Sequence, residues 1–371
     1  MARRGVPLAI TWPDWLDRLA AKAPVAVFVA VGRDAIERVE ELSLDSRINW
    51  VASPRHANLL LVAGKVRDKD AQALRAVHDQ MPRPRKTLWW GSAPFQELVS
   101  PTVLLLAEDA VLSALSLHTR VSNSEPDWLP DTPPNPWQGL GPNGQGGKGM
   151  MGGVPYGRPM AMTDDDGRDG LQLDQTTVQM GPFLQTWPAG LVLELALQGD
   201  VIQRARVVHS PYGPTLGLRE GVSSRLRSAA RLLRLLELDS LAERCRRAAA
   251  AHDHRQAADI AALRAAVRYS GAFVALPAGL GACRLDGAPS DIRSRLIAWL
   301  GGGADPSNDA MTELKPKLSG LLTGLEWNEA MLVVNSFTPR QLHGMALRET
   351  VPDEGDDNPS SKTHPDMESA H

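Results

Sequence analysis

A stretch of 34 residues, 126–159, holds eight prolines and nine glycines. Proline removes a backbone hydrogen-bond donor and glycine adds conformational freedom, so neither a helix nor a strand ladder persists at that density. The stretch predicts a linker or a long extended crossover. The whole chain has 371 residues, 43% of them hydrophobic, which is more than one core usually needs. We therefore expect two domains, residues 1–125 and 160–345, on either side of this linker.

The first part, residues 1–125, alternates between strand-like and helix-like patterns. Apolar, β-branched runs predict strands, and apolar residues at helical spacing predict helices. Strands that alternate with helices imply a parallel sheet covered on both faces. Such a sheet normally carries its chemistry on the loops after the strands. The expected strands are 25–31, 49–52, 58–63 and 87–90, and the expected helices are 34–42 and 70–80.

The second part changes its periodicity. Alternating leucines over 191–198, a Gln-Gly-Asp turn and a second alternation over 202–208 predict a β-hairpin. Residues 221–268 predict helices rich in arginine, and a helix near 318–330 is expected to lead into a strand at 331–335. The fold class expected for the chain is an α/β parallel-sheet N-terminal domain followed by an α+β C-terminal domain with a β-hairpin and arginine-rich helices.

The charge balance and the hydropathy of the chain exclude some classes of function. The 40 Lys and Arg residues nearly balance the 43 Asp and Glu residues, so no overall field attracts nucleic acid. No apolar run reaches the 18 or so residues that a spanning helix needs, and the start of the chain lacks a signal-peptide core. A cytoplasmic location follows as the expectation. Residues 346–371 are polar and acidic, which predicts a disordered tail.

Two cysteines, Cys245 and Cys283, are the only thiols in the chain, and they are 38 positions apart. They form no Cys-x-x-Cys pair, so a disulfide framework, a four-cysteine zinc site and an all-cysteine iron–sulfur cluster held by this chain alone are excluded. We expect no metal site and no cofactor. The acidic run 164–170 is interpreted as a turn, with a loose calcium site as the alternative.

Three motifs carry a resemblance to a known family. The chain has Ser-Pro-Arg-His-Ala-Asn-Leu-Leu-Leu-Val-Ala-Gly at 53–64, Asp-Gln-Met-Pro at 79–82 and Gly-Ser at 91–92. Over about residues 24–95 it closely resembles the cluster-bearing small subunit of respiratory complex I (NADH:quinone oxidoreductase) and of energy-converting hydrogenases. Gly-Pro-Phe-Leu-Gln-Thr-Trp-Pro at 181–188, with the hairpin after it, resembles the start of the partner large subunit. The chain therefore looks like a fusion of a small-subunit domain with a shortened large-subunit-like domain.

The departures from that family determine the functional prediction. The family holds a terminal [4Fe–4S] cluster with cysteines at positions that match Arg33, Asp34 and Ala93 here. A guanidinium or a methyl group cannot replace a thiolate as an iron ligand, so the resemblance implies an empty cluster site. The family's quinone-pocket histidine matches Leu184, which can neither donate a proton nor hydrogen-bond a quinone.

The resemblance and these departures together predict a redox-silent scaffold or coupling subunit of a complex I-like or energy-converting-hydrogenase-like membrane assembly. Such a protein would lie in the cytoplasm against the inner membrane, bind antiporter-like membrane subunits and not be catalytic alone. The alternative is a protein or enzyme that binds a small anion or substrate in the vacated cavity, rimmed by Arg33, Asp34, Arg55 and His56. In a third interpretation, a separate chain supplies the missing cysteines.

Two further clusters have alternative interpretations. Ten arginines and five acidic residues between 225 and 268 give a local charge of +5. This charge indicates either a solvated surface or a surface that docks onto an acidic partner subunit or lipid headgroups. His252, Asp253 and His254 carry metal-ligating groups, but neighbours at i and i+2 do not share a helix face. A solvated helix junction is the expected state of these three residues.

Overall fold

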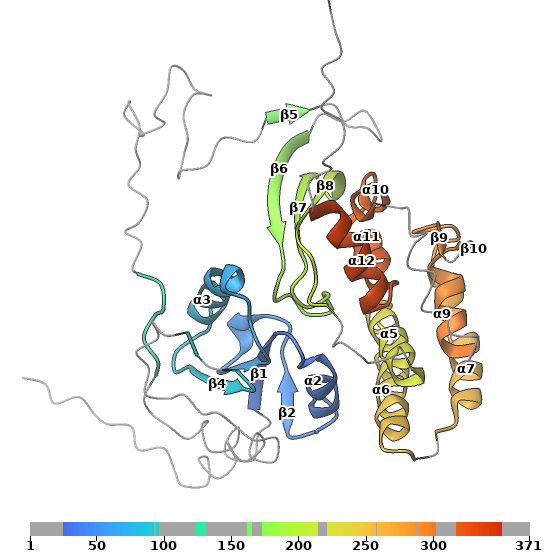
Figure 1. Ribbon diagram of the computed structural model, residues 1–371, viewed down its shortest axis with the longest axis horizontal. Helices are drawn as coiled ribbons and strands as arrows, with labels where there is room; N and C mark the ends of the chain where they lie inside the picture. Colours follow the sequence, from blue (N-terminus) through green and yellow to red (C-terminus); the bar gives the residue numbers. More distant parts are fainter. Residues whose placement is uncertain are drawn as a thin grey trace, which may run out of the picture.

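The computed structural model describes residues 25–92, 94–95, 124–130, 162–164, 173–213, 221–256, 258–285, 288–301 and 317–350. These residues form two domains that pack side by side (Figure 1). We call the described residues between 25 and 130 the parallel-sheet domain, and those between 162 and 350 the C-terminal domain.

The parallel-sheet domain is built on four parallel strands in the order β2-β1-β3-β4. All five residues of the third strand, β3, are buried, because helices cover both faces of the sheet. Leu61 packs with α2 on one face, and Leu60 packs with α3 on the other. The elements are β1 (Val25–Val31), α2 (Ile36–Leu42), β2 (Ile48–Trp50), η1 (Pro54–His56), β3 (Leu59–Ala63), η2 (Asp68–Asp70), α3 (Ala71–Asp79) and β4 (Lys86–Trp90).

The C-terminal domain begins with an antiparallel sheet in the order β5-β6-β7-β8. The expected hairpin is present as β7 and β8, and Gly199 takes a positive φ of 61° at its turn, where glycine is favoured. Buried leucines of β7 face the helices and form one core with them. The strands are β5 (Met162–Asp164), β6 (Leu173–Met180), β7 (Val192–Gln198) and β8 (Val201–His209).

Helices and one short strand pair complete the C-terminal domain. Their apolar faces meet in a single core that includes the buried thiol of Cys245. Figure 1 shows α11 and α12 against the antiparallel sheet, and α5 and α6 beside α2 of the other domain. The elements are α5 (Val222–Leu235), α6 (Asp239–Asp253), α7 (Ile260–Tyr269), α8 (Ala272–Ala275), β9 (Cys283–Leu285), β10 (Ala288–Ser290), α9 (Ile292–Gly301), α10 (Leu318–Leu322), α11 (Trp327–Asn335) and α12 (Pro339–Thr350).

Two expectations about the C-terminal residues are wrong. The strand expected at 331–335 is instead the second half of α11, which a capping box of Glu326 and Glu329 begins. Helix α12 continues to Thr350, so residues 346–350 do not belong to a disordered tail. Ala346 is fully buried in the core because it follows Leu342 at helical spacing. Residues 351–371 lie outside the described residues.

Candidate functional site: a cavity between the two domains

A cavity of about 210 Å³ lies between the two domains. Residues of β1, β2 and α2 line it from the parallel-sheet domain, and residues of α5, α6 and α11 line it from the C-terminal domain. The loop between β6 and β7 supplies a third side. Much of the surface is apolar, with contributions from Val29, Val31, Phe183, Trp187 and Leu342. The cavity therefore exists only because the two domains pack together.

The loop of residues 181–190 is held in place by contacts with both domains. Its first residue, Gly181, has a φ of 105°, a conformation that favours glycine, where the chain leaves β6. The indole of Trp187 donates a hydrogen bond to the carbonyl of Leu191 at 2.8 Å. The side-chain amide of Gln185 donates to the carbonyl of Val51, across the domain boundary, at 3.0 Å. These bonds fix the loop as a wall of the cavity.

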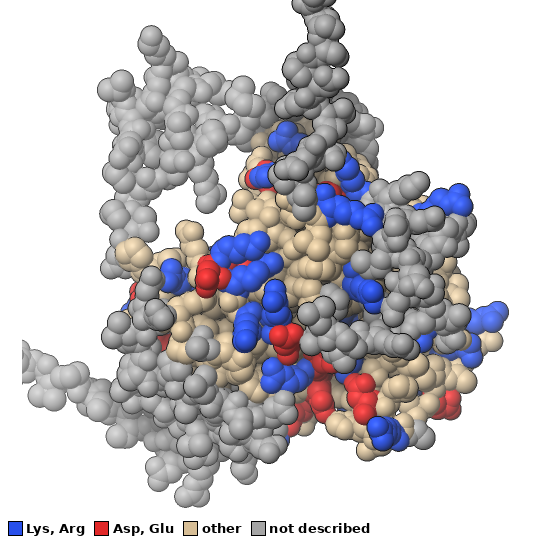
Figure 2. All heavy atoms as spheres, in the orientation of Figure 1, with Lys and Arg blue, Asp and Glu red and all other residues tan. Residues whose placement is uncertain are grey.

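Charged side chains line the cavity where α2 meets α5 and α6. Glu40 of α2 forms ion pairs with Arg227 at 2.9 Å and with Arg231 at 3.4 Å, both on α5. Burial raises the pKa of Glu40, and this effect outweighs the opposing attraction of Arg231 and Arg227. In Figure 2, basic and acidic side chains lie next to each other on the face where the two domains meet.

The remaining arginines of the cavity differ in their pairing. Arg246 binds Glu243 of its own helix and donates to the Ser43 hydroxyl at 2.8 Å. Arg227 has Asp253 as an additional partner. Arg234, in contrast, has no hydrogen-bond or ion-pair partner for its guanidinium among the residues that the structure describes. The lining thus contains four arginines but a single carboxylate, and one arginine is left unpaired.

Three buried polar atoms on residues that line the cavity have no hydrogen-bond partner. One is Glu40 Oε2, which is ion-paired with Arg227 without a hydrogen bond of good geometry. The other two are the indole nitrogen of Trp50, a donor, and the side-chain oxygen of Asn335, an acceptor. The amide nitrogen of Asn335 donates to the carbonyl of Met331 at 2.9 Å, which fixes the orientation of the side chain. Buried polar atoms are normally hydrogen-bonded, so the unpaired donor of β2 and the unpaired acceptor of α11 are exceptions on the two sides of the domain interface.

A second polar cluster, which we call the Asp70 junction, adjoins the cavity through Tyr212 and joins the two domains. It consists of Arg67 and Asp70 from the parallel-sheet domain and of His209 and Tyr212 from the C-terminal domain. Asp70 is 1% exposed and accepts hydrogen bonds from Arg67 at 2.6 Å and from the Tyr212 hydroxyl at 3.0 Å. His209 Nδ1 lies 3.1 Å from the other carboxylate oxygen. The junction closes one end of the domain interface.

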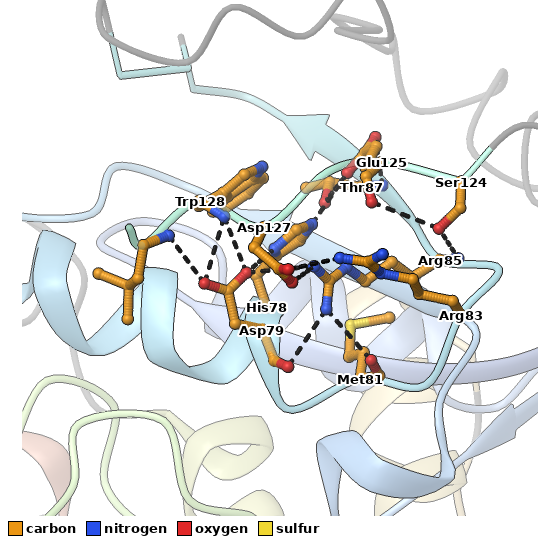
Figure 3. A network of polar contacts seen from close by, with 11 residues as sticks. His78, Asp79, Met81, Arg83, Arg85, Thr87, Ser124, Glu125, Asp127 and Trp128 are labelled. Atoms are coloured by element: carbon orange, nitrogen blue, oxygen red, sulfur yellow. Dashed lines mark hydrogen bonds and ion pairs between the residues drawn. The ribbon is translucent and has the colours of Figure 1, made fainter. Parts of the chain in front are cut away.

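A third polar cluster holds residues 124–130, which we call the strap, against the parallel sheet (Figure 3). The fully buried His78 stacks on Trp128, with ring centroids 3.7 Å apart, and lies 3.1 Å from Glu125. Glu125 also accepts hydrogen bonds from the backbone and the hydroxyl of Thr87. Arg85 binds Asp127 in turn, and this hydrogen bond lowers the pKa of that carboxyl. These contacts anchor the strap, although Arg85 Nε and Trp128 Nε1 are buried without a hydrogen-bond partner.

The four residues expected to rim an anion pocket do not come together. Arg33 and Asp34 follow β1, whereas Arg55 and His56 lie in η1, just before β3. Because β1 and β3 are parallel, the two pairs lie at opposite edges of the sheet, about 16 Å apart along a strand of five residues. The expectation of one pocket formed by all four is therefore wrong. All four side chains are exposed, and Arg33 forms a β-bridge with Lys65.

The other residues that the sequence analysis singled out lie at separate places in the chain. Leu184 lies in the cavity wall. Ala93 lies outside the described residues. Cys245 and Cys283 are free thiols, and burial raises the pKa of Cys245 to about 12, so this thiol is protonated at neutral pH. The possible calcium run at 164–170 is described only at its first residue.

The cluster at 252–254 and the arginine-rich helices have partners within this chain. His252 bonds to Ser223, Asp253 pairs with Arg227, and His254 lies 2.7 Å from Glu41 of α2. The three side chains thus have three different partners, as expected of a helix junction. Several of the arginines likewise face the acidic side of α2, so the chain itself supplies part of the acidic surface that the docking interpretation assigned to a partner.

The chain matches no model of a known protein family. Within the described residues, no helix has the length and apolar character needed to cross a membrane. No group of three or more His, Cys, Asp or Glu side chains among the same residues is arranged to hold a metal ion. The site described above is built from an apolar wall, arginine side chains and buried polar atoms.

Proposed function

We propose that this protein is a redox-silent peripheral subunit of a complex I-like or energy-converting-hydrogenase-like membrane assembly, with a scaffold or coupling role in the cytoplasm at the inner membrane. The observation that carries the proposal is Arg33, which occupies a cluster-ligand position of the resembled family at the end of an intact β1. A guanidinium cannot ligate iron, so a protein of that family with arginine at this position would keep its fold without the electron carrier.

The packing of the two domains supports a scaffold role. Two sets of polar contacts join the two domains. One is the Asp70 junction, and the other is the pair of ionic contacts between Glu40 and arginines of α5. Buried and partly buried ion pairs with defined geometry favour one relative orientation over others. A two-domain unit of fixed orientation presents a constant outer surface to partner subunits. This property is what an assembly component without redox chemistry needs.

Copurification and iron analysis test the proposal together. The native chain carries a tag at its C-terminal end, membranes are solubilised in a mild detergent under anaerobic conditions, and an untagged strain is the control. We expect antiporter-like membrane subunits to copurify with the chain, and iron to be far below stoichiometric. A stoichiometric [4Fe–4S] signal in the electron paramagnetic resonance spectrum would contradict redox silence. Recovery of the chain alone from the soluble fraction would contradict the scaffold role.

A further inference from the structure

The interdomain cavity contains features that a purely structural role does not use. The indole donor of Trp50 and the side-chain acceptor of Asn335 are both buried and have no hydrogen-bond partner. The Asn335 side chain is only 1% exposed. A packed interface without a ligand normally satisfies such atoms or replaces them with apolar groups. Trp50 lies on the parallel-sheet side of the cavity and Asn335 on the C-terminal side, so a molecule between the two domains could supply an acceptor to Trp50 and a donor or a bridging water to Asn335.

The charged side chains of the cavity indicate the sign of the charge on that molecule. Glu40 is ion-paired with Arg227 and Arg231, although its Oε2 accepts no hydrogen bond, and the four arginines of the lining outnumber this single carboxylate. Arg234 lines the same cavity, is half-buried and has no partner among the described residues. A guanidinium that is partly withdrawn from water gains most from a carboxylate or phosphate, which it binds through two parallel hydrogen bonds.

The size and the walls of the cavity indicate the rest of the molecule. An apolar cavity of about 150 Å³ in a protein core takes up benzene. The volume here is about 210 Å³, and its walls include Phe183, Trp187 and Leu342, so a somewhat larger apolar group fits. Ligand sites typically combine such an apolar surface with a few polar groups that fix orientation.

We infer that the cavity binds an acidic amphiphile, a molecule with an apolar body and one carboxylate or phosphate group. The apolar body lies between Phe183 and Trp187 of the loop and the helices opposite, and the anionic group binds Arg234. The indole of Trp50 and the amide of Asn335 complete the polar contacts. Binding is reversible and breaks no covalent bond. The inference rests on the cavity alone, so it stands whether or not the chain belongs to a membrane assembly.

A neutral quinone is the ligand that must be distinguished from an acidic amphiphile. Leu184 stands in the cavity wall and offers no hydrogen bond to a quinone carbonyl, whereas Arg234 offers a charge that a quinone does not need. The two ligand types therefore predict opposite dependence on Arg234. A neutral ligand keeps its affinity when this charge is removed, and an anionic ligand loses it.

Isothermal titration calorimetry on the full chain tests the inference. The probes are decanoate, decyl phosphate, decanol and decyl-ubiquinone, each below its micelle concentration. We expect a 1:1 complex with one or both anions, and the preferred anion identifies the headgroup. The anion should bind at least about tenfold more tightly than decanol, because a charge-assisted contact is lost in the alcohol.

Variants assign the binding to the cavity. Arg234→Gln should weaken the anion about tenfold and leave decanol unchanged, whereas Arg247→Gln, at an exposed position on α6 outside the cavity, should change neither. Trp50→Phe, which keeps an aromatic ring but removes the indole donor, should weaken the anion less. Equal affinity for decanoate, decyl phosphate and decanol in the unaltered chain would overturn the inference. So would tighter binding of the quinone, the absence of any binding, or an unchanged affinity in a folded Arg234→Gln protein.

Discussion

Tyr212 donates its hydroxyl hydrogen to Asp70 at 3.0 Å, across the boundary between two domains whose contacting residues are 142 positions apart in the chain. Burial raises the pKa of Tyr212, and the negative charge of Asp70 acts in the same direction, so the phenol stays protonated and remains a donor. Asp70 is 1% exposed and depends on its partners for solvation. The stability of the domain interface therefore depends on this bond.

Tyr212→Phe is expected to lower the free energy of unfolding by about 1–2 kcal/mol, because one hydrogen bond to a buried carboxylate is lost while the ring remains. Asp70 keeps Arg67 and His209 as partners in this variant. Urea unfolding followed by tryptophan fluorescence measures the change. Tyr269→Phe is the control, because Tyr269 is 84% exposed, and it should change little. Equal effects of the two substitutions would show that the hydroxyl of Tyr212 contributes nothing to stability.

The Asp70 junction also makes stability depend on pH through His209. Burial lowers the pKa of His209 below its ordinary value of 6.5, and the charge of Lys69 adds to this effect against the opposing Asp70. The unfolded chain then binds the proton more readily than the folded protein does. The contribution of neutral His209 is therefore fully present above pH 6.5 and is lost as the pH falls through and below that value.

We expect the unfolding free energy of the protein to fall between pH 7 and pH 5 more steeply than that of a His209→Gln variant. Denaturant titrations at several pH values measure both slopes, and the exposed His56→Gln serves as the control. If the slope of His209→Gln equals that of the unaltered protein, His209 does not titrate differently in the folded and unfolded states.

The strap offers a test of the third polar cluster. Glu125→Ala removes the acceptor of two hydrogen bonds from Thr87 and of the contact with His78, all of which are buried. We expect a loss of about 3 kcal/mol, because these groups are then buried without partners. Glu125→Gln retains one acceptor and should lose less. Urea unfolding compares them, together with the rate of proteolysis near residue 130. Equal losses in the two variants would show that the hydrogen-bond acceptors do not matter.

The sequence predicted the parallel sheet within about two residues of each strand, since a strand buried on both faces is a continuous apolar run. The same rule failed at 331–335, because a short apolar run does not distinguish a strand from a buried helix turn. The two glutamates one turn apart, Glu326 and Glu329, were the available signal for a helix start.

The candidate site was predicted only in part, because its chemistry comes from distant residues. Leu184 was singled out only as a departure from a family motif, and it lies in the cavity wall. Nothing local in the sequence joins Glu40 to Arg231, which are 191 positions apart, or marks Trp50 and Asn335 as unpaired. Pairing of this kind depends on tertiary packing, so local periodicity and composition contain no record of it.

Gly190 is the last residue of the cavity loop and packs closely against Tyr212 and Arg67 of the Asp70 junction. Its substitution therefore tests both features. Gly190 has a φ of 82°, and a Cβ atom there would lie 2.8 Å from the ring of Tyr212 and 3.0 Å from the guanidinium of Arg67. Gly271 is a matched control with a φ of 86° and open space around it. Any non-glycine residue costs about 1–2 kcal/mol in this left-handed conformation.

Gly271→Ala should therefore lower the unfolding free energy by about 1 kcal/mol, and Gly190→Ala by roughly 3 kcal/mol, because the second variant adds a steric clash to the backbone strain. Chemical denaturation of the two variants, side by side with the unaltered protein, measures the difference. A Gly190→Ala protein that is no less stable than Gly271→Ala would mean that Tyr212 and Arg67 can move away from the added methyl at no cost. In that case the junction between the two domains would not depend on the close packing of residue 190 against Tyr212.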